Sequence, residues 1–429
     1  MFLEKVAQIW KIKDLRKNIL IVLGLLVIFR LVAHVPIPGV NAVALKNFFS
    51  SNQLLGLLNI FSGGGLANFS VIMLGVGPYI TASIIFQLLV MIIPALEEFS
   101  KDEQGRRRIN QYTRLLTVPL AAFQAFAMIK ILQNAQTGPQ RIISADLPLL
   151  TLLQIILIVT AGTIFLMWLG EIISERKIGN GISIIIFAGI VTEIPGAVGQ
   201  ILAVFDPTQI FILVGFLIIA FVTVSSVVFI TEGQRNIPVS YAKRVRGMRM
   251  YGGMDTHLPI RVNQAGMIPI IFAISIILFP SMIAQFFINA KTAWVAAAAQ
   301  WLIELFQNHL FYGSLYFLLV VGFTYFYTAV VFHPQQIADN LQKQGAFVPG
   351  IRPGRTTAEY LNTIVNRIVF TGALFLGCIA TLPILLGEVP NAPQNMIISG
   401  ASLLIVVGVV IDIMQQINSQ LTMRDYENF

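Results

Sequence analysis

The stretch QIFILVGFLIIAFVTVSSVVFIT, residues 209–231, contains 23 residues and no charged side chain. A helix rises about 1.5 Å per residue, so about 20 apolar residues cross the hydrocarbon core of a bilayer. A buried helix of a soluble domain is usually shorter and carries polar residues on one face. The stretch therefore predicts a membrane-spanning helix.

The composition extends this prediction to the whole chain. Of its 429 residues, 56% are hydrophobic and only 11% are charged, whereas a soluble domain has about 25% charged residues. The mean hydropathy is +0.79. These values exclude a soluble enzyme, a disordered chain and a coiled coil. The single cysteine, Cys378, excludes an intramolecular disulfide.

Ten segments are long and apolar enough to span a membrane. They are residues 18–35, 71–93, 113–133, 149–170, 181–201, 209–231, 264–288, 310–332, 366–386 and 396–415. One further apolar run, LLGLLNIFSGGGL at residues 54–66, is too short and is interrupted by three glycines. We expect it to be a re-entrant segment.

The basic residues indicate the orientation. If the N-terminus and every second connection lie on one side, that side carries 23 of the 28 Lys and Arg residues, and the other side carries 3. Basic residues gather on the cytoplasmic side, so both termini are predicted to be cytoplasmic. The N-terminal apolar run has no small-residue cleavage site, so we expect it to be a retained helix.

Two of the cytoplasmic connections are long, residues 233–262 and 333–365. In the first, IPVSYAKRV (237–245) alternates apolar and polar residues, which is typical of a hairpin strand. The second has Pro and Gly turn signals around Arg352. We expect ordered projections, with a solvated charged linker as the alternative.

The predicted fold class is an all-α polytopic membrane protein. Ten spans with two similar long loops favour two five-helix halves, residues 1–201 and 202–429. We expect the halves to be related as an inverted repeat. No residue-level repeat is visible between them.

Motifs for enzymatic chemistry are missing. The chain has no G-x-x-x-x-G-K-[ST] loop and no H-E-x-x-H motif. We expect no catalytic residue, no metal and no cofactor. Arg30, Lys130, Glu171 and Asp412 are predicted near helix ends, and the span interiors look almost free of charge. This argues against an ion-coupled pump or a transporter of charged solutes.

Some apolar and polar positions allow two interpretations. Val76 and Ile80 lie four residues apart, as do Ile186 and Ile190, so each pair shares a helical face. The pairs could line a path or simply pack helices together. Four polar residues within or beside spans could join helices by hydrogen bonds or mark a seam that opens: Thr81, Gln87, Gln124 and Asn263.

Specific strings add a family resemblance. They include NIFSGGGL (59–66), GPYITASIIFQLL (77–89), GRRRINQYTR (105–114), IGNGISIIIFAGIV (178–191) and GAFVPGIRPG (345–354). Together they resemble the SecY family, the channel subunits of bacterial protein translocons. The resemblance implies a passive protein-conducting channel in the inner membrane, with two halves around an hourglass pore. The alternative is a secondary transporter of a small neutral solute.

The resemblance also implies roles for particular residues. A plug is expected at residues 59–74, centred on Ser62, Gly63, Gly64, Gly65, Leu66, Ala67, Asn68 and Phe69. An apolar pore ring is expected at Val76, Ile80, Ile186, Ile190, Ile271 and Ile405. A lateral gate is expected between the second and third spans and the seventh and eighth, with Thr81, Gln87, Gln124 and Asn263 in that region.

The partners that the resemblance implies are SecE, SecG, the SecA motor, the ribosome, signal peptides and preproteins, and membrane lipids. Motor and ribosome docking is expected at the tips of the long loops, on Lys243, Arg244, Arg246, Arg249 and Arg352. The chain itself is not expected to be an enzyme, because a separate motor, the ribosome or the membrane potential would supply the energy.

Overall fold

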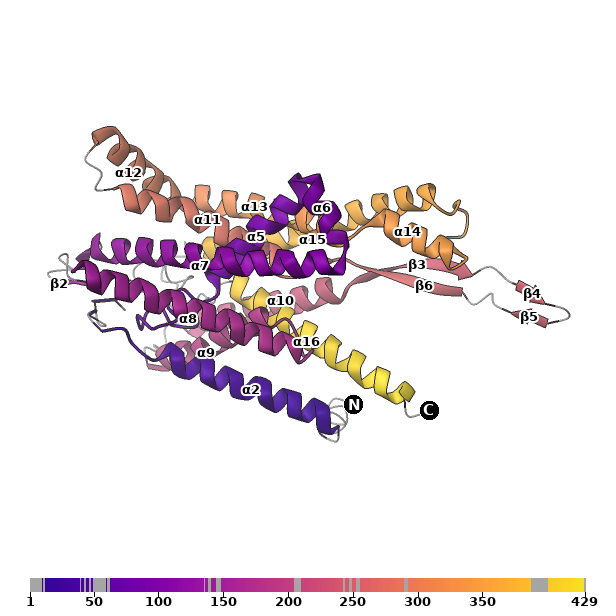
Figure 1. Ribbon diagram of the computed structural model, residues 1–429, viewed down its shortest axis with the longest axis horizontal. Coiled ribbons are helices and arrows are strands. Elements are labelled where there is room, and N and C mark those ends of the chain that lie inside the picture. Colours follow the sequence, from indigo (N-terminus) through magenta and orange to yellow (C-terminus); the bar gives the residue numbers. More distant parts are fainter. Residues whose placement is uncertain are drawn as a thin grey trace.

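The structure is a computed structural model, shown as a ribbon in Figure 1. The residues it describes are 10, 12–38, 40–41, 44–45, 48, 59, 62–134, 136–137, 140–143, 148–203, 210–241, 244–246, 249–251, 255–288, 292–386 and 400–427.

A helix lies at each of the ten predicted spans. These helices are α2 (Lys13–Ala33), α5 (Gly77–Ile92), α7 (Glu103–Asn134), α8 (Leu149–Glu175), α9 (Gly181–Ala203), α10 (Ile210–Glu232), α11 (Ile268–Phe287), α13 (His309–Val331), α15 (Arg355–Leu386) and α16 (Gly400–Glu427). Large apolar side chains such as Phe211 and Phe221 on α10 are exposed on the bundle surface, as expected of helices whose solvent is lipid.

Length and composition support membrane crossing for fewer than ten of these helices. Among the described residues, six helices are long and apolar enough, or seven if α5 and the following short helix form one bent span. Two further apolar stretches, in α9 and α10, are shorter. Helix α2 has Asp14 in its first turn and Arg30 in its last, which shortens its apolar part. The count of ten spans is thus only partly confirmed.

The second predicted span begins later than expected. Helix α5 starts at Gly77, not at residue 71, and residues 62–76 form successive turns. Gly63, Gly64 and Gly75 all have positive φ angles, as does Phe69. A right-handed helix cannot contain such residues. Gly75, which lies inside the predicted span, therefore delays the start of α5 to Gly77.

Three helices were not predicted. Helix α6 (Pro94–Lys101) follows α5 after a bend of 105°. Helix α12 (Ala293–Gln307) joins α11 to α13, and α14 (Pro334–Lys343) begins the second long loop. All three are short, and α6 and α14 mix charged with apolar residues, so the search for long apolar runs passed over them.

The two long loops share one antiparallel sheet. Strand β3 (Gln234–Tyr241) pairs with β6 (Asp255–Arg261) on one side and with β7 (Ala346–Phe347) on the other. The hairpin continues in β4 (Arg244–Arg246) and β5 (Arg249–Tyr251). The prediction of a hairpin strand at 237–245 is confirmed for β3 and β4.

A small apolar core anchors this sheet. Ile237 and Ile260 from the hairpin are buried against the N-terminal part of α15, including Leu361 and Val365. Helix α15 begins eleven residues before the predicted span at 366 because these residues pack on the sheet rather than in lipid. The loops are therefore ordered projections and not solvated linkers.

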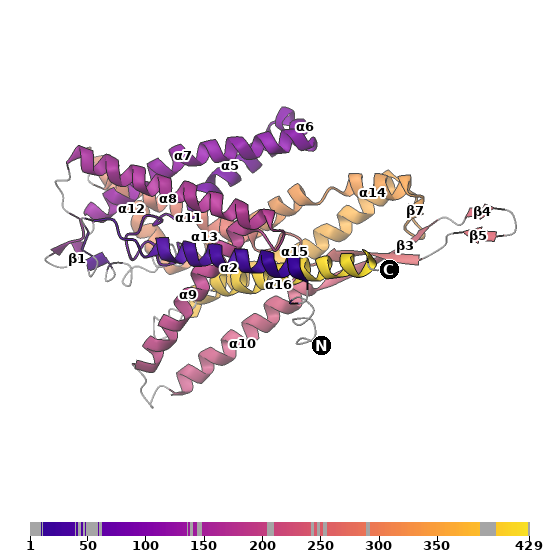
Figure 2. The ribbon, with the colours of Figure 1, turned by 60° about the horizontal axis from the view of Figure 1, so that its bottom comes forward.

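Figures 1 and 2 show the long hairpin, α6, α14 and both chain ends directed toward one end of the bundle. The opposite end carries α12 and the small hairpin of β1 (Gln136–Thr137) and β2 (Gln140–Arg141). The connections thus alternate between two ends, as the distribution of basic residues predicts.

Helices adjacent in the chain pack side by side, α5 on α7, α7 on α8 and α8 on α9. In the second part of the chain, α11 packs on α13 and α13 on α15. The two parts meet where α11 contacts α5 and α7, and where α16 contacts α9. The predicted boundary between the halves, at 201/202, falls in the last turn of α9. The division into two halves stays a prediction.

Candidate functional site

The six predicted ring residues come together in one buried apolar cluster. Each is at most 9% exposed and all belong to the same core. Val76 caps α5 and Ile80 lies in its first turn, whereas the others come from three more helices: Ile186 and Ile190 on α9, Ile271 on α11 and Ile405 on α16. Four helices thus contribute aliphatic side chains to this buried cluster.

A cavity of about 80 Å³ opens beside this cluster. Its lining combines parts of the predicted ring, plug and gate: Leu66, Leu74, Val76, Gly77, Ile80, Thr81, Gln124, Met128, Ile186, Ile271, Ile274, Ser275 and Phe279. The lining comes from α5, α7, α9 and α11 together with the turns before α5. Most of it is apolar, so the cavity offers no fixed charge to a ligand.

The predicted plug is a compact series of turns held by its own hydrogen bonds. Asn59 Oδ1 accepts a hydrogen bond from the backbone amide of Ala67 at 2.8 Å. The backbone carbonyl of Asn59 accepts a hydrogen bond from Ser62 Oγ at 2.9 Å. Ser62 Oγ in turn accepts from the amide of Leu66 at 3.1 Å. These bonds close residues 59–67 into one unit. Residues 60 and 61 lie outside the described part of the chain.

Glycine is required at the centre of this unit. A Cβ atom on Gly63 would lie 2.8 Å from Cζ of Phe29 and 3.2 Å from Cα of Gly189. Gly63 also has a φ of +66°, a conformation that costs other residues energy. The plug turn therefore fits against α2 and α9 because the residue in contact with them, Gly63, has no side chain.

Two charged residues, on α2 and α9, contact the predicted plug. Arg30 Nη1 of α2 donates to the carbonyl of Gly63 at 2.8 Å, and Asn59 Nδ2 donates to Glu193 Oε1 of α9 at 3.1 Å. Glu193 was missed by the sequence reasoning, which treated the span interiors as almost free of charge. Its signal was simply a lone carboxylate in an apolar stretch, at VTEIP (191–195).

The four predicted gate residues are not gathered at one place. Thr81 and Gln124 line the cavity, whereas Gln87 and Asn263 do not. Thr81 donates to the carbonyl of Gly77 and Gln87 donates to Ser83 Oγ, both within α5. These two bonds therefore do not join helices. Asn263 lies before α11, buried, with its Oδ1 unpaired among the described residues.

The gate helices themselves are neighbours. Helix α11 contacts both α5 and α7, and it packs on α13 through aromatic contacts. Phe272 of α11 makes edge-to-face contacts with Phe323 and Tyr327 of α13, with ring centroids 6.0 and 6.2 Å apart. The predicted line of contact between the second and third spans and the seventh thus exists in this structure.

Four of the five predicted docking residues lie in the described parts of the long loops. Arg244, Arg246 and Arg249 are on β4 and β5, at the outer end of the hairpin in Figure 1. Arg352 is exposed in the turn before α15. Lys243 lies outside the described residues.

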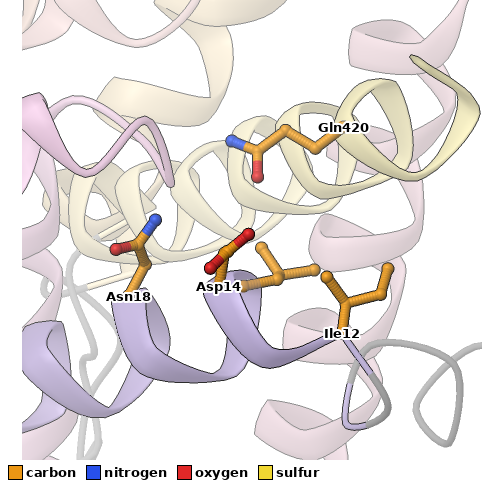
Figure 3. Close-up of a pocket in the computed structure, with 5 residues that line it drawn as sticks. Ile12, Asp14, Asn18 and Gln420 are labelled. Atoms are coloured by element: carbon orange, nitrogen blue, oxygen red, sulfur yellow. The ribbon is translucent and has the colours of Figure 1, made fainter. Parts of the chain in front are cut away.

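A second, smaller cavity of about 60 Å³ lies where the ends of the chain approach each other. Figure 3 shows Asp14 and Asn18 of α2 facing Gln420 of α16 across it. Gln420 Nε2 also donates to the carbonyl of Lys177 at 2.6 Å, which ties α16 to the turn between α8 and α9. Its position and contacts suit a structural joint.

One ion pair joins two neighbouring helices of the bundle. Arg114 of α7 and Glu171 of α8 form an ion pair at 2.5 Å. Within the described part of the chain, no three His, Cys, Asp or Glu residues are grouped to hold a metal ion.

The SecY family profile matches residues 70–414. The chain belongs to the SecY family. It is 45% identical to the protein translocase subunit SecY of Streptomyces griseus, over 99% of this chain and 98% of that protein.

Solved structures share the fold. A structure described as a protein conducting channel aligns with a TM-score of 0.63 at 18% identity, over 93% of this chain and 90% of that one. Sec61 in the canine ribosome-channel complex from the endoplasmic reticulum aligns with a TM-score of 0.58 at 16% identity, again over 93% and 90%. The alternative of a small-solute transporter finds no support in these relatives.

Proposed function

We propose that this chain is the channel subunit of a protein translocon, which moves signal-bearing polypeptides across the cytoplasmic membrane. The observation that carries the proposal is the buried apolar cluster that holds all six predicted ring residues, from four helices, with the predicted plug turn and a small apolar cavity beside it. In a chain of the SecY family, this is the arrangement that a gated, non-enzymatic pore requires.

The ring explains how a passing chain could be sealed against ions. Aliphatic side chains form a constriction that excludes water, and they offer no charge that would hold a particular sequence. Side chains of this kind also adapt in shape to whatever passes. In the idle state, the plug residues Ser62–Phe69 would close the path next to Val76 and Ile80.

The contact of α5 and α7 with α11 is the proposed lateral gate. A signal peptide or transmembrane segment would leave the pore sideways by separating these helices and would partition into lipid. The contact region includes few polar bonds between helices, so the separation would break mainly apolar packing, which lipid tails can replace.

The hairpin and the Arg352 turn are the proposed docking surface for the SecA motor and the ribosome, and both chain ends would be cytoplasmic. SecE and SecG are the proposed small partner subunits. Support for the ribosome comes from the structural likeness to Sec61 in a ribosome-channel complex, and support for the surface comes from Arg352, which is exposed. Such charges steer association.

The function is tested by reconstitution of the chain with SecE and SecG in inner-membrane lipid vesicles. We expect a signal-bearing preprotein to become protease-protected only when SecA and ATP are present. A preprotein with a charged residue in the apolar core of its signal is the matched control and should stay accessible. Saturable uptake of a small solute by the chain alone would contradict the proposal.

A further inference from the structure

The described part of α9 contains a carboxylate, Glu193, that the proposed channel mechanism does not use. It is half-buried, and it accepts a hydrogen bond from the side chain of Asn59, 134 residues earlier in the chain. A carboxylate in an apolar helix is costly unless it is paired. Its contact with the plug turn is therefore a reason to ask what it does there.

Arg30 of α2 also contacts this turn. Its guanidinium donates to the carbonyl of Gly63, which is part of the plug. A Cβ atom placed on Gly64 would lie 3.6 Å from Glu193 Oε1 and 3.8 Å from Arg30 Nη1. Both charged groups therefore lie close to Gly64, and they interact electrostatically with each other.

We propose that Arg30 and Glu193 form a latch that holds the plug turn, residues 59–67, against α2 and α9 while the channel is idle. This inference rests on the proposed function, since it assigns a holding site to the proposed plug. Each charge makes one hydrogen bond to the turn, and each neutralises the other. Displacing the turn would break both of these hydrogen bonds to charged groups, which costs free energy.

Asn59 is the centre of this arrangement. Its Nδ2 reaches Glu193, while its Oδ1 accepts from the amide of Ala67 and so closes the turn. One side chain thus couples the internal fold of the turn to its attachment on α9. Both attachment helices precede residue 204, so the plug is latched only to the first part of the chain. Helices α11 and α16 can move without breaking the latch.

The test exchanges the donor and the acceptor of the bond. Asn59→Asp keeps the oxygen that accepts from Ala67 but sets a second carboxylate against Glu193. In Asn59→Asp/Glu193→Gln, the new amide donates to the new carboxylate, so the bond is restored with its direction reversed and the balance of charge is kept. Glu304→Gln on the exposed side of α12 is the matched control for loss of a glutamate.

Plug position is measured by thiol labelling. Asn68→Cys in a Cys378→Ser background provides one partly exposed thiol in the plug. The full chain, with SecE and SecG, is reconstituted and labelled by a membrane-impermeant maleimide added on the α12 side. Ion conductance of the same samples is recorded in planar bilayers.

We expect Asn59→Asp to raise the labelling rate and the leak conductance roughly tenfold or more, because a bond to a charged group is lost and a repulsion is added. The double variant should return to within about twofold of the parent, on the same reasoning. Glu304→Gln should leave both readings unchanged. Arg30→Gln should act in the same direction as Asn59→Asp, since it removes the second bond.

Two results would overturn the latch. Either Asn59→Asp labels and conducts like the parent, or the double variant stays as open as the single one. A chain lacking residues 62–69 separates this failure from failure of the proposed plug. If the deletion leaks and the latch variants do not, the plug stands and the latch falls. If the deletion does not leak, the proposed plug falls, and the labelling rates alone decide whether the pair holds the segment.

Discussion

Ile190 lies 3% exposed on α9, in the same cluster as Ile405 of α16 and Ile271 of α11. In the chain it is one of many isoleucines in apolar helices, and the i, i+4 pair with Ile186 fits ordinary packing as well as a ring. Its partners are 81 and 215 residues away in sequence numbering. The ring is therefore a tertiary feature, and only the family resemblance could indicate it in advance.

Replacing Ile190 with Ser should raise the ion conductance of the idle channel several-fold. The hydroxyl would hold water at a constriction that aliphatic side chains keep dry. Membrane insertion should be unchanged because the substitution leaves the helix apolar. The measurement is conductance in planar bilayers, with Ile218→Ser, on a side chain 58% exposed on α10, as the control. Equal conductance in both variants would make Ile190 a packing residue.

Replacing Arg352 with Glu should reduce SecA- or ribosome-driven translocation about tenfold or more and leave membrane assembly normal. Charge reversal on an exposed arginine turns attraction into repulsion at a docking surface. Preprotein transport into vesicles measures the loss. Arg107→Glu is the control, on another cytoplasmic helix end, where the exposed pair with Glu103 contributes little stability. If both variants transport like the parent, Arg352 does not dock a partner.

At the scale of elements, hydropathy located every long helix and alternation located β3. What it could not locate was the start of α5, since residues 71–76 are as apolar as the helix that follows but contain backbone geometry reserved for turns. It also did not indicate that β7 of the second loop pairs with β3 of the first. A two-residue strand has no periodicity, so its existence depends on the partner that it meets.

The shared sheet implies that the two loops lose order together. Ile237→Ala removes a side chain that is 2% exposed from the small core under the hairpin. It should cost about 2–5 kcal/mol of local stability. Amide hydrogen exchange should accelerate both in residues 234–241 and in residues 346–347. Arg235→Ala, at an exposed position of the same strand, should leave exchange unchanged. Faster exchange in the hairpin alone would mean that the loops are not coupled.

At the scale of the whole molecule, the two parts of the chain meet along α11, which contacts α5 and α7, and along α16, which contacts α9. The cavity lies between α11 and the helices α5 and α7, and the hydrogen bonds of Arg30 and Glu193 to the plug turn both come from helices of the first part. Opening along α11 would therefore widen the cavity without first removing the plug from α2 and α9.

Linking α5 to α11 should stop translocation. Thr81→Cys and Ser275→Cys place thiols on the two helices at the cavity they both line, in a Cys378→Ser background. A short bifunctional reagent should block preprotein transport, and a reducible reagent should allow recovery after reduction. The control pair, Gly313→Cys with Ile384→Cys, links α13 to α15 within the second part, where these residues are in contact. Transport through the linked α5–α11 pair would exclude this contact as the gate.

The sequence by itself determined the membrane class, the positions of the helices, the two ends of the bundle and the family. These properties depend on contiguous residues, because lipid requires an unbroken apolar length and basic residues stay on one side. Only the tertiary structure decided that four helices bring six aliphatic side chains to one point, that two distant loops form one sheet, and that Arg30 and Glu193 hold the same turn. Which helical faces meet depends on the fit of side chains far apart in the chain, and a hydropathy pattern does not record that fit.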